Sequence, residues 1–151
     1  MHIKSIEPQH PGVQPLIIES DLYMASLYPS ESNHMESIQA LALSNIFFIG
    51  GFVDDLLVAC GAVKILDDDG TYGEIKRVFV LRDYRGRGLS KMIMEHLESD
   101  LKACAINIAR LETGIKQPEA LGLYRKLAYV ERGPFGSYKS DPLSVFMEKR
   151  L

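Results

Sequence analysis

Three strand-like segments follow one another in the middle of the chain, and an acidic turn separates each from the next. Residues 45–53 and 56–66 are rich in Ile, Phe and Val, and the pair Asp54-Asp55 between them predicts a tight turn. A second acidic stretch, residues 67–70, reverses the chain before the alternating segment 72–81. Because consecutive strands joined by short turns pair antiparallel, we expect a three-stranded meander here.

Helical patterns flank this meander. Residues 13–27 fit a helix with imperfect amphipathic phase, and Asn33 with Glu36 three residues later predicts an N-cap and a helix to about Leu43. The clearest helix begins at Leu89, where apolar residues recur at helical spacing up to Cys104. A fourth begins at Pro118, which suits a first helical turn.

The remaining segments complete a mixed sheet. Residues 2–6 alternate, residues 106–113 read as a strand, and two short strands close the chain. Consecutive strands followed by alternation of helix and strand predict a mixed α/β sheet. No linker or repeat interrupts the apolar segments, so residues 1–151 are expected to form a single domain.

Composition excludes several classes of function. The net charge of -3 argues against a broad nucleic-acid surface. No apolar run approaches the roughly 18 residues that span a bilayer, and the N-terminus lacks a signal-peptide core, so we expect a cytoplasmic protein without membrane contact. The four histidines have no ligand spacing, and no metal is expected. Cys60 and Cys104 lie in apolar surroundings and are expected in the core.

A glycine turn rich in arginine directly precedes the clearest helix. Two glycines, Gly86 and Gly88, alternate with Arg85 and Arg87 between a strand and a helix N-terminus, where backbone N–H groups and the helix dipole favour an anion. Neither the nucleotide P-loop nor the dinucleotide fingerprint fits this spacing. The segment therefore predicts a diphosphate cradle, and a capping turn with solvated arginines is the alternative.

Residues 85–90 resemble the R-x-x-G-x-G/A pyrophosphate loop of the GNAT superfamily of acyl-CoA-dependent N-acetyltransferases. Residues 73–80 are similar to the strand before that loop, and residues 120–129 to the A-x-x-L-Y-x-x-x-G-F segment; the ending, residues 135–148, is similar to that of small bacterial members. The resemblance covers residue 45 to the C-terminus. It implies the GNAT fold, a mostly antiparallel, twisted sheet of about six to seven strands with about four helices, and acetyl-CoA as acetyl donor.

The resemblance also implies which residues contact the cofactor. The loop would hold the pyrophosphate, the backbone of the preceding strand would bind the acetyl carbonyl and pantetheine arm, and Gln117 stands where an Asn is usual. The implied cofactor-binding residues are Val78, Phe79, Val80, Arg85, Gly86, Arg87, Gly88, Leu89, Ser90 and Gln117. The chain departs from the pattern at Ser90, which replaces Gly or Ala, at Gln117, and at Ala128, which replaces Gly.

Two residues are implied as catalytic. Glu74 matches a strand glutamate that serves as general base in some members, and Tyr124 would donate a hydrogen bond or proton to the departing thiolate. Each has a structural alternative. Glu74 could pair with Lys76 on the same strand face, which would lower its pKa, whereas a base requires a pKa raised by burial. Tyr124 could be a core tyrosine, since it lies on the apolar stripe of its helix.

The expected function is therefore acetyl-CoA-dependent N-acetylation of a primary amine on a small-molecule or amino-acid-like acceptor. Transfer would be direct in a ternary complex, because neither cysteine lies in a nucleophile motif. The alternative is a non-catalytic acyl-CoA-binding regulatory or sensing module. The polar loops 29–34 and 133–142 are expected to line the acceptor site, with Lys76 and Arg77 facing an acceptor carboxylate. No nucleic-acid partner is expected, and the oligomeric state stays open, a homodimer included.

Overall fold

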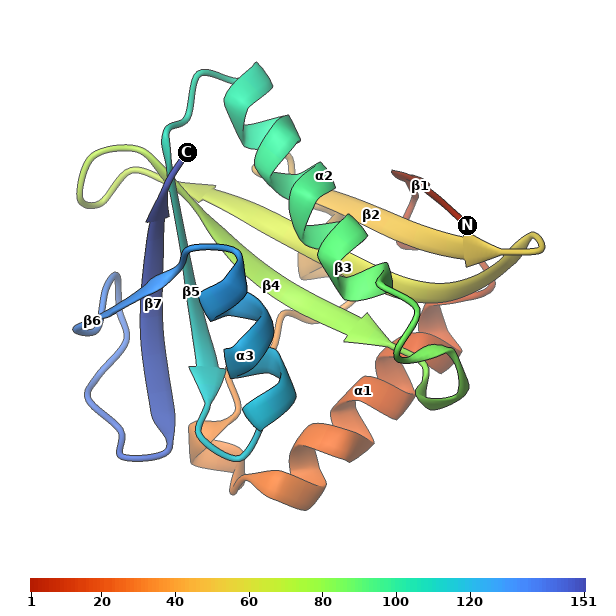
Figure 1. Cartoon of the computed structure of the whole chain (residues 1–151), viewed down its shortest axis with the longest axis horizontal. Coiled ribbons are helices and arrows are strands. Elements are labelled where there is room, and N and C mark those ends of the chain that lie inside the picture. The colour runs from red at the N-terminus through yellow and green to blue at the C-terminus, as the bar shows by residue number, and fades with distance from the viewer.

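Seven strands form one twisted mixed sheet in the computed structural model, which describes residues 1–151 (Figure 1). Their order across the sheet is β1-β2-β3-β4-β5-β7-β6, and every neighbouring pair is antiparallel except β4 and β5. The strands are β1 (His2–Ser5), β2 (Ile46–Val53), β3 (Leu56–Leu66), β4 (Tyr72–Val80), β5 (Ile108–Gly114), β6 (Val130–Arg132) and β7 (Ser144–Arg150). The predicted meander is β2, β3 and β4, and the predicted mixed sheet is confirmed.

The turn between β2 and β3 is the two-residue hairpin that the sequence predicts. Asp54 and Asp55 have φ values of 49° and 65°, the left-handed conformation that both central residues of a type I′ turn require. Short polar side chains tolerate this conformation better than most. The acidic pair therefore fixes the register of the pairs next to the turn, Val53 opposite Leu56 and Phe52 opposite Leu57, and a bulge between Phe52 and Gly51 shifts the rest of this ladder, which ends with Ile46 opposite Lys64.

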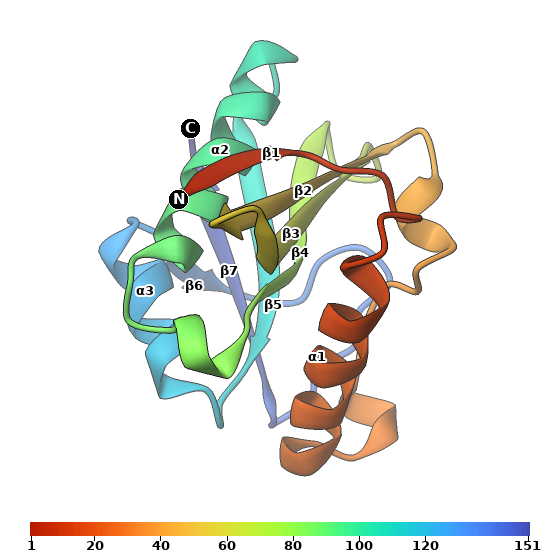
Figure 2. The same ribbon diagram turned by 90° about the vertical axis from the view of Figure 1, so that its right-hand side faces the viewer.

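Three α-helices cover the two faces of the sheet. Helices α2 (Leu89–Ala103) and α3 (Pro118–Lys126) lie on one face in Figure 1, and α1 (Val13–Leu27) lies on the other, as the side view in Figure 2 shows. The face under α2 buries the larger apolar cluster, which includes Ile93, Leu97 and Leu111. The face under α1 buries a second one around Leu16 and Phe48. Both cores form because each strand presents alternate side chains to opposite faces.

The helix predicted from Asn33 to about Leu43 is wrong, and the molecule has three α-helices where about four were expected. The segment instead contains one short 3₁₀ turn, Ala40–Ala42, and another, Ser30–Ser32, directly precedes it. A capping box needs Glu36 to reach back to the Asn33 N–H, but that N–H donates to Ser30 O. Glu36 instead pairs through Oε1 with Lys64 and Lys76, at 3.4 and 3.5 Å.

A bulge in β4 changes which side chains face α1. Cys60 pairs with Phe79 and Ala62 with Lys76, so the single residue between them on β3 faces two on β4, of which Arg77 has φ 58°. The extra residue makes Lys76 and Arg77 point to the same face, toward α1. Arg77 donates through Nη1 to Asp21 on α1 at 2.6 Å and through Nε to Glu36 O at 2.8 Å.

The parallel pair β4 and β5 separates toward its carboxyl ends. Only three residues of each strand are paired, from Gly73 opposite Ala109 to Ile75 opposite Leu111. Beyond Ile75, β4 continues to Val80 with β3 on one side and no strand on the other. We call this opening the β4–β5 gap, and it leaves backbone groups of a central strand without a sheet partner.

The two cysteines differ in their surroundings. Cys60 on β3 is buried, as predicted, but Cys104 is exposed, so the prediction that it lies in the core is wrong. Cys104 ends the apolar stripe of α2 as its C-cap, and the chain turns away at Ala105, whose φ is 59°. None of the helices combines the length and the apolar character needed to cross a bilayer.

Candidate functional site

The glycine turn predicted to hold a diphosphate lies at the N-terminus of α2. Gly86 and Gly88 have φ values of 77° and 81°, a conformation that residues with a Cβ rarely adopt. A Cβ built on either would meet nothing within 4 Å, so the turn faces open space. The glycines are thus required by the backbone conformation, and the space beside them is free for a ligand.

The first turn of α2 has donors without helical acceptors. Gly88 is the N-cap, and the Met92 N–H is the first to bond within the helix, to Gly88 O at 3.1 Å. The amides of Leu89, Ser90 and Lys91 therefore lack intrahelical acceptors, and no acidic residue lies in this turn to compete for them.

The two arginines of the turn are held beside it by aromatic rings. Arg85 donates through Nε to Val80 O at 3.1 Å, and its guanidinium lies 5.1 Å from the ring centre of Tyr23. The Arg87 guanidinium lies 4.9 Å from the ring centre of Tyr84. Both arginines are exposed, so their positive charges are accessible to an anion from solvent. These residues fit a diphosphate, because charge, donors and open space coincide.

Val78, Phe79 and Val80 lie at the β4–β5 gap, on the part of β4 that has no β5 partner. This is the position in which their backbone could bind an extended ligand. Phe79 and Val80 are buried, so the strand is rigidly held by both cores. The separation of the strands was not detectable from the sequence, because each strand alone has an ordinary apolar pattern.

A cavity opens at this gap and brings together the two catalytic candidates. Glu74 from β4 and Tyr124 from α3 both line it, together with Val78, Phe79 and Gln117. The loop after α1 contributes Ser32 and His34, and the connection between β6 and β7 contributes Tyr138. The two predicted acceptor loops therefore meet at one cavity, and Ser32 Oγ joins them by donating to Asp141 Oδ2 at 2.6 Å.

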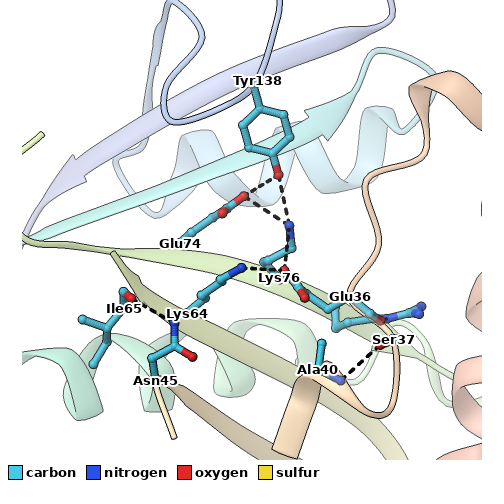
Figure 3. Close-up of polar contacts among 10 residues, drawn as sticks. Glu36, Ser37, Ala40, Asn45, Lys64, Ile65, Glu74, Lys76 and Tyr138 are labelled. Carbon is cyan, nitrogen blue, oxygen red and sulfur yellow. Dashed lines mark hydrogen bonds and ion pairs between the residues drawn. The ribbon is translucent and has the colours of Figure 1, made fainter. Parts of the chain in front are cut away.

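Glu74 is almost fully buried, at 4% exposure, and it is held by two partners (Figure 3). The Tyr138 hydroxyl donates to its Oε2 at 2.5 Å, and Lys76 Nζ lies 3.4 Å from the same oxygen. Lys76 also donates to the Tyr138 hydroxyl oxygen at 3.1 Å. The predicted pairing of Glu74 with Lys76 is therefore present. Both side chains lie on one face of β4, as strand alternation requires.

A second carboxylate, Glu112 on β5, faces the same cavity. It lies one residue beyond the last β4–β5 pair and accepts a hydrogen bond from Ser144 Oγ at 2.8 Å. Burial raises its pKa above the ordinary value, and this effect outweighs the Ser144 hydrogen bond and the charges of His34 and Lys76. Glu112 has no ion-pair partner within 4 Å, unlike Glu74.

Tyr124 is buried at 8% exposure, packs in the larger core and still lines the cavity. Burial, with a further contribution from the Glu112 charge, raises its pKa to about 12. The phenol therefore keeps its proton at neutral pH. No protein group forms a hydrogen bond with its hydroxyl, which leaves that donor available to a molecule in the cavity. Both descriptions of Tyr124, core residue and site residue, are compatible with this placement.

Gln117 is fixed by a tyrosine that sequence reasoning did not single out. The Tyr28 hydroxyl donates to Gln117 Oε1 at 3.2 Å and accepts from the Lys116 N–H at 3.1 Å. The side chain of Arg77, in contrast, donates to Asp21 and to the Glu36 carbonyl. It is therefore not available for an acceptor carboxylate, contrary to the expectation from the sequence.

Tyr28, Glu112 and Tyr138 line the cavity, but the sequence analysis gave none of them a role of its own, although Tyr138 lies within the predicted acceptor loop 133–142. Glu112 could have been found from the sequence, because it is an acidic residue near the end of the largely apolar segment 106–113. Nothing in the sequence places Tyr138 beside Glu74, because 64 positions separate them.

These features define a class of protein. A helix N-terminus prepared for a diphosphate, a gap between central strands and a cavity with carboxylates and tyrosines describe an acyltransferase that takes its acyl group from a coenzyme A thioester. Residues 17–129 match the model of the Acetyltransferase (GNAT) family, and the chain belongs to this family. It is an N-acetyltransferase, with acetyl-CoA as its acetyl donor.

Individual relatives agree with this assignment. A protein of Azospirillum brasilense named IAA acetyltransferase is 43% identical over 144 residues, covering 95% of this chain and 94% of the relative. A solved structure from Klebsiella pneumoniae, assigned as an acyl-CoA N-acyltransferase, is 31% identical with a TM-score of 0.82, covering 99% and 97% of the two chains. The fold is shared with PaiA N-acetyltransferase of Thermoplasma acidophilum, solved in complex with coenzyme A (19% identity, TM-score 0.78, 99% and 98% coverage).

Proposed function

We propose that the protein transfers an acetyl group from acetyl-CoA to the primary amine of a small-molecule or amino-acid-like acceptor, directly and within a ternary complex. The observation that carries this proposal is the single cavity at the β4–β5 gap, where Tyr124 and two carboxylates meet a few residues from the diphosphate cradle. Direct transfer is supported by the cysteines. Cys60 is buried with its pKa raised by burial to about 12, Cys104 is exposed at the C-cap of α2, and neither lines the cavity.

The donor side of the site binds through backbone groups and arginines. Acetyl-CoA, when bound, supplies an activated thioester carbonyl and a thiolate leaving group. In the proposal, residues 85–90 hold the diphosphate, the β4 backbone at Val78, Phe79 and Val80 orients the arm, and Gln117, fixed by Tyr28, borders it. A preorganised backbone donor at the carbonyl contributes about 2.7–4 kcal/mol.

Proton transfers in the proposal involve Glu74 and Tyr124. A lysine-like amine has a pKa near ~10.4, so the acceptor must lose a proton, and a general base contributes about 10²- to 10⁴-fold. Glu74 takes this proton through Oε1, the oxygen that neither Tyr138 nor Lys76 holds. Glu112, unpaired in the same cavity, is the alternative base. Tyr124, whose hydroxyl has no protein partner, donates a hydrogen bond or its proton to the departing thiolate.

Turnover assays test this function. The protein is mixed with acetyl-CoA and a panel of primary amines, amino acids and IAA, and release of free thiol is followed. We expect thiol release with at least one amine, with the acetyl group recovered on that amine by mass spectrometry.

Binding measurements separate the enzyme from the non-catalytic acyl-CoA-binding module that the sequence analysis gave as its alternative. Stabilisation by acetyl-CoA in a thermal melt, without thiol release for any amine, would favour that module. If acetyl-CoA does not stabilise the protein in a thermal melt and titration with coenzyme A releases no heat, residues 85–90 do not bind the diphosphate.

A further inference from the structure

We propose that Tyr138 is a positioning residue for this reaction: its phenol, with Lys76, holds one oxygen of Glu74 and leaves the other oxygen to face the acceptor amine. The inference rests on the proposed function, because it assigns a role to Tyr138 through Glu74. It concerns a residue on the connection between β6 and β7, 64 positions from Glu74 in the sequence (Figure 3).

The three groups form a closed triangle of contacts. The Tyr138 hydroxyl donates to Glu74 Oε2, and Lys76 Nζ lies within reach of both that oxygen and the phenol oxygen, at 3.4 and 3.1 Å. All contacts to the carboxylate go to Oε2, and no protein donor holds Oε1. A carboxylate held at one oxygen cannot rotate freely, so the direction of Oε1 is fixed.

The ring of Tyr138 is itself firmly placed. It packs edge-on against Phe135 and Phe146, with ring centres 5.3 and 5.4 Å apart, and against His34 from the loop after α1, at 5.1 Å. Contacts on several sides fix the direction of the phenol. Reacting groups must be held in a narrow range of geometry for proton transfer, so such support has kinetic value.

The phenol acts as a donor throughout the physiological pH range. Burial, followed by the charge of Glu74, raises the pKa of Tyr138 far above its ordinary value of 10. Other charged or titratable groups that face this triangle are Glu36, Glu112, His34 and Tyr124. Ionisation of Tyr138 would place a second negative charge beside Glu74, which explains the direction of the shift.

A double-mutant cycle tests the proposal in the purified full-length protein. Tyr138→Phe keeps the ring and removes the hydroxyl, and Glu74→Gln removes the proposed base. We expect Tyr138→Phe to lower kcat roughly 10-fold, a fraction of a full general-base contribution, with KM for acetyl-CoA changed less than about twofold. In the Glu74→Gln background the same change is expected to lower kcat less than about twofold, since its effect acts through Glu74.

Tyr72→Phe is the matched control. Tyr72 belongs to the same aromatic cluster and donates its hydroxyl to a different carboxylate, Asp68 Oδ1, at 2.8 Å. Its loss is expected to leave kcat within about twofold. Equal losses of kcat for Tyr138→Phe in both backgrounds, or no loss in the wild-type background, would overturn the positioning role.

The outcomes also separate this inference from the proposed function. Unchanged kcat in Glu74→Gln would remove the base assignment and, with it, the role of Tyr138. If the wild-type protein acetylates no amine, the proposed function fails. The free energy of unfolding is then measured for the wild type, the two single variants and the double variant. Non-additive losses there would still support the triangle of contacts, whereas strict additivity would refute it.

Discussion

Replacing Ala128 by Gly should stabilise the protein, because this alanine occupies a position built for glycine. Ala128 follows the C-cap of α3 with φ 74°. Its N–H donates to Arg125 O and the next N–H, of Tyr129, donates to Tyr124 O, both at 3.0 Å. These two bonds are the 5→2 and 6→1 pattern of a Schellman motif, whose left-handed residue is usually Gly.

The magnitude follows from two opposing terms. The left-handed conformation costs an L-residue roughly 1–2 kcal/mol, and the greater freedom of Gly in the unfolded chain costs about 0.4–1 kcal/mol. Ala128 is exposed, so removing its methyl group sacrifices no buried contact. We expect a net gain of about 1 kcal/mol, which for a domain of this size corresponds to roughly 2–4 °C in Tm.

Thermal and denaturant melts of matched variants measure this gain. Ala105→Gly, at the equivalent left-handed position after α2 (φ 59°), should give a similar gain. Ala25→Gly, at an exposed position within α1, should lose about 0.5–1 kcal/mol. A Tm for Ala128→Gly equal to or below that of the wild type would refute the assignment of strain at this residue.

The other predictions concern ligand binding, turnover and pH. Gly88→Asp should abolish binding of coenzyme A in calorimetry, because it adds bulk, strain and negative charge to the cradle, whereas unchanged affinity would place the diphosphate elsewhere. Tyr124→Phe should lower turnover roughly 10-fold or more with near-normal coenzyme A affinity; equal loss of both would make the ring purely structural. Burial raises the pKa of Glu112 above 4.5, so its contribution to stability is fully present below about pH 4.5 and is lost as pH rises through the folded pKa. Glu112→Gln should therefore raise Tm at neutral pH, with a gain that disappears in melts below about pH 4.5; a gain independent of pH would contradict this.

Local signals in the sequence were sufficient for most of the fold. The boundaries of α1 and β3 agree with prediction to the residue, since hydrophobic pattern and turn residues coincide there. The segment 33–43 was predicted wrongly because Asn33 and Glu36 imitate a capping box, while long-range partners on β3 and β4 take up the Glu36 side chain. Propensity cannot anticipate such tertiary partners.

The candidate site likewise has one part that the sequence predicts and one part that it does not. The diphosphate cradle lies in one continuous segment, and the left-handed conformations of Gly86 and Gly88 agree with the prediction of a turn. The cavity, in contrast, depends on contacts between distant positions, such as Tyr138 with Glu74 and Tyr28 with Gln117. The departure at Ala128 was visible in the sequence, but its conformational cost became apparent only from the backbone.

The bulge at Arg77 has a consequence for how this enzyme can evolve. Because the extra residue turns Lys76 and Arg77 to one face, a single short stretch of β4 both anchors α1 and supplies the lysine beside Glu74. Loss of Arg77 would restore strict alternation and leave every later side chain of the strand on its present face, but it would remove the residue that ties the strand to α1. Point substitutions can alter the walls around the acceptor gradually, whereas removal of this irregularity requires a deletion that also takes away the ion pair with Asp21.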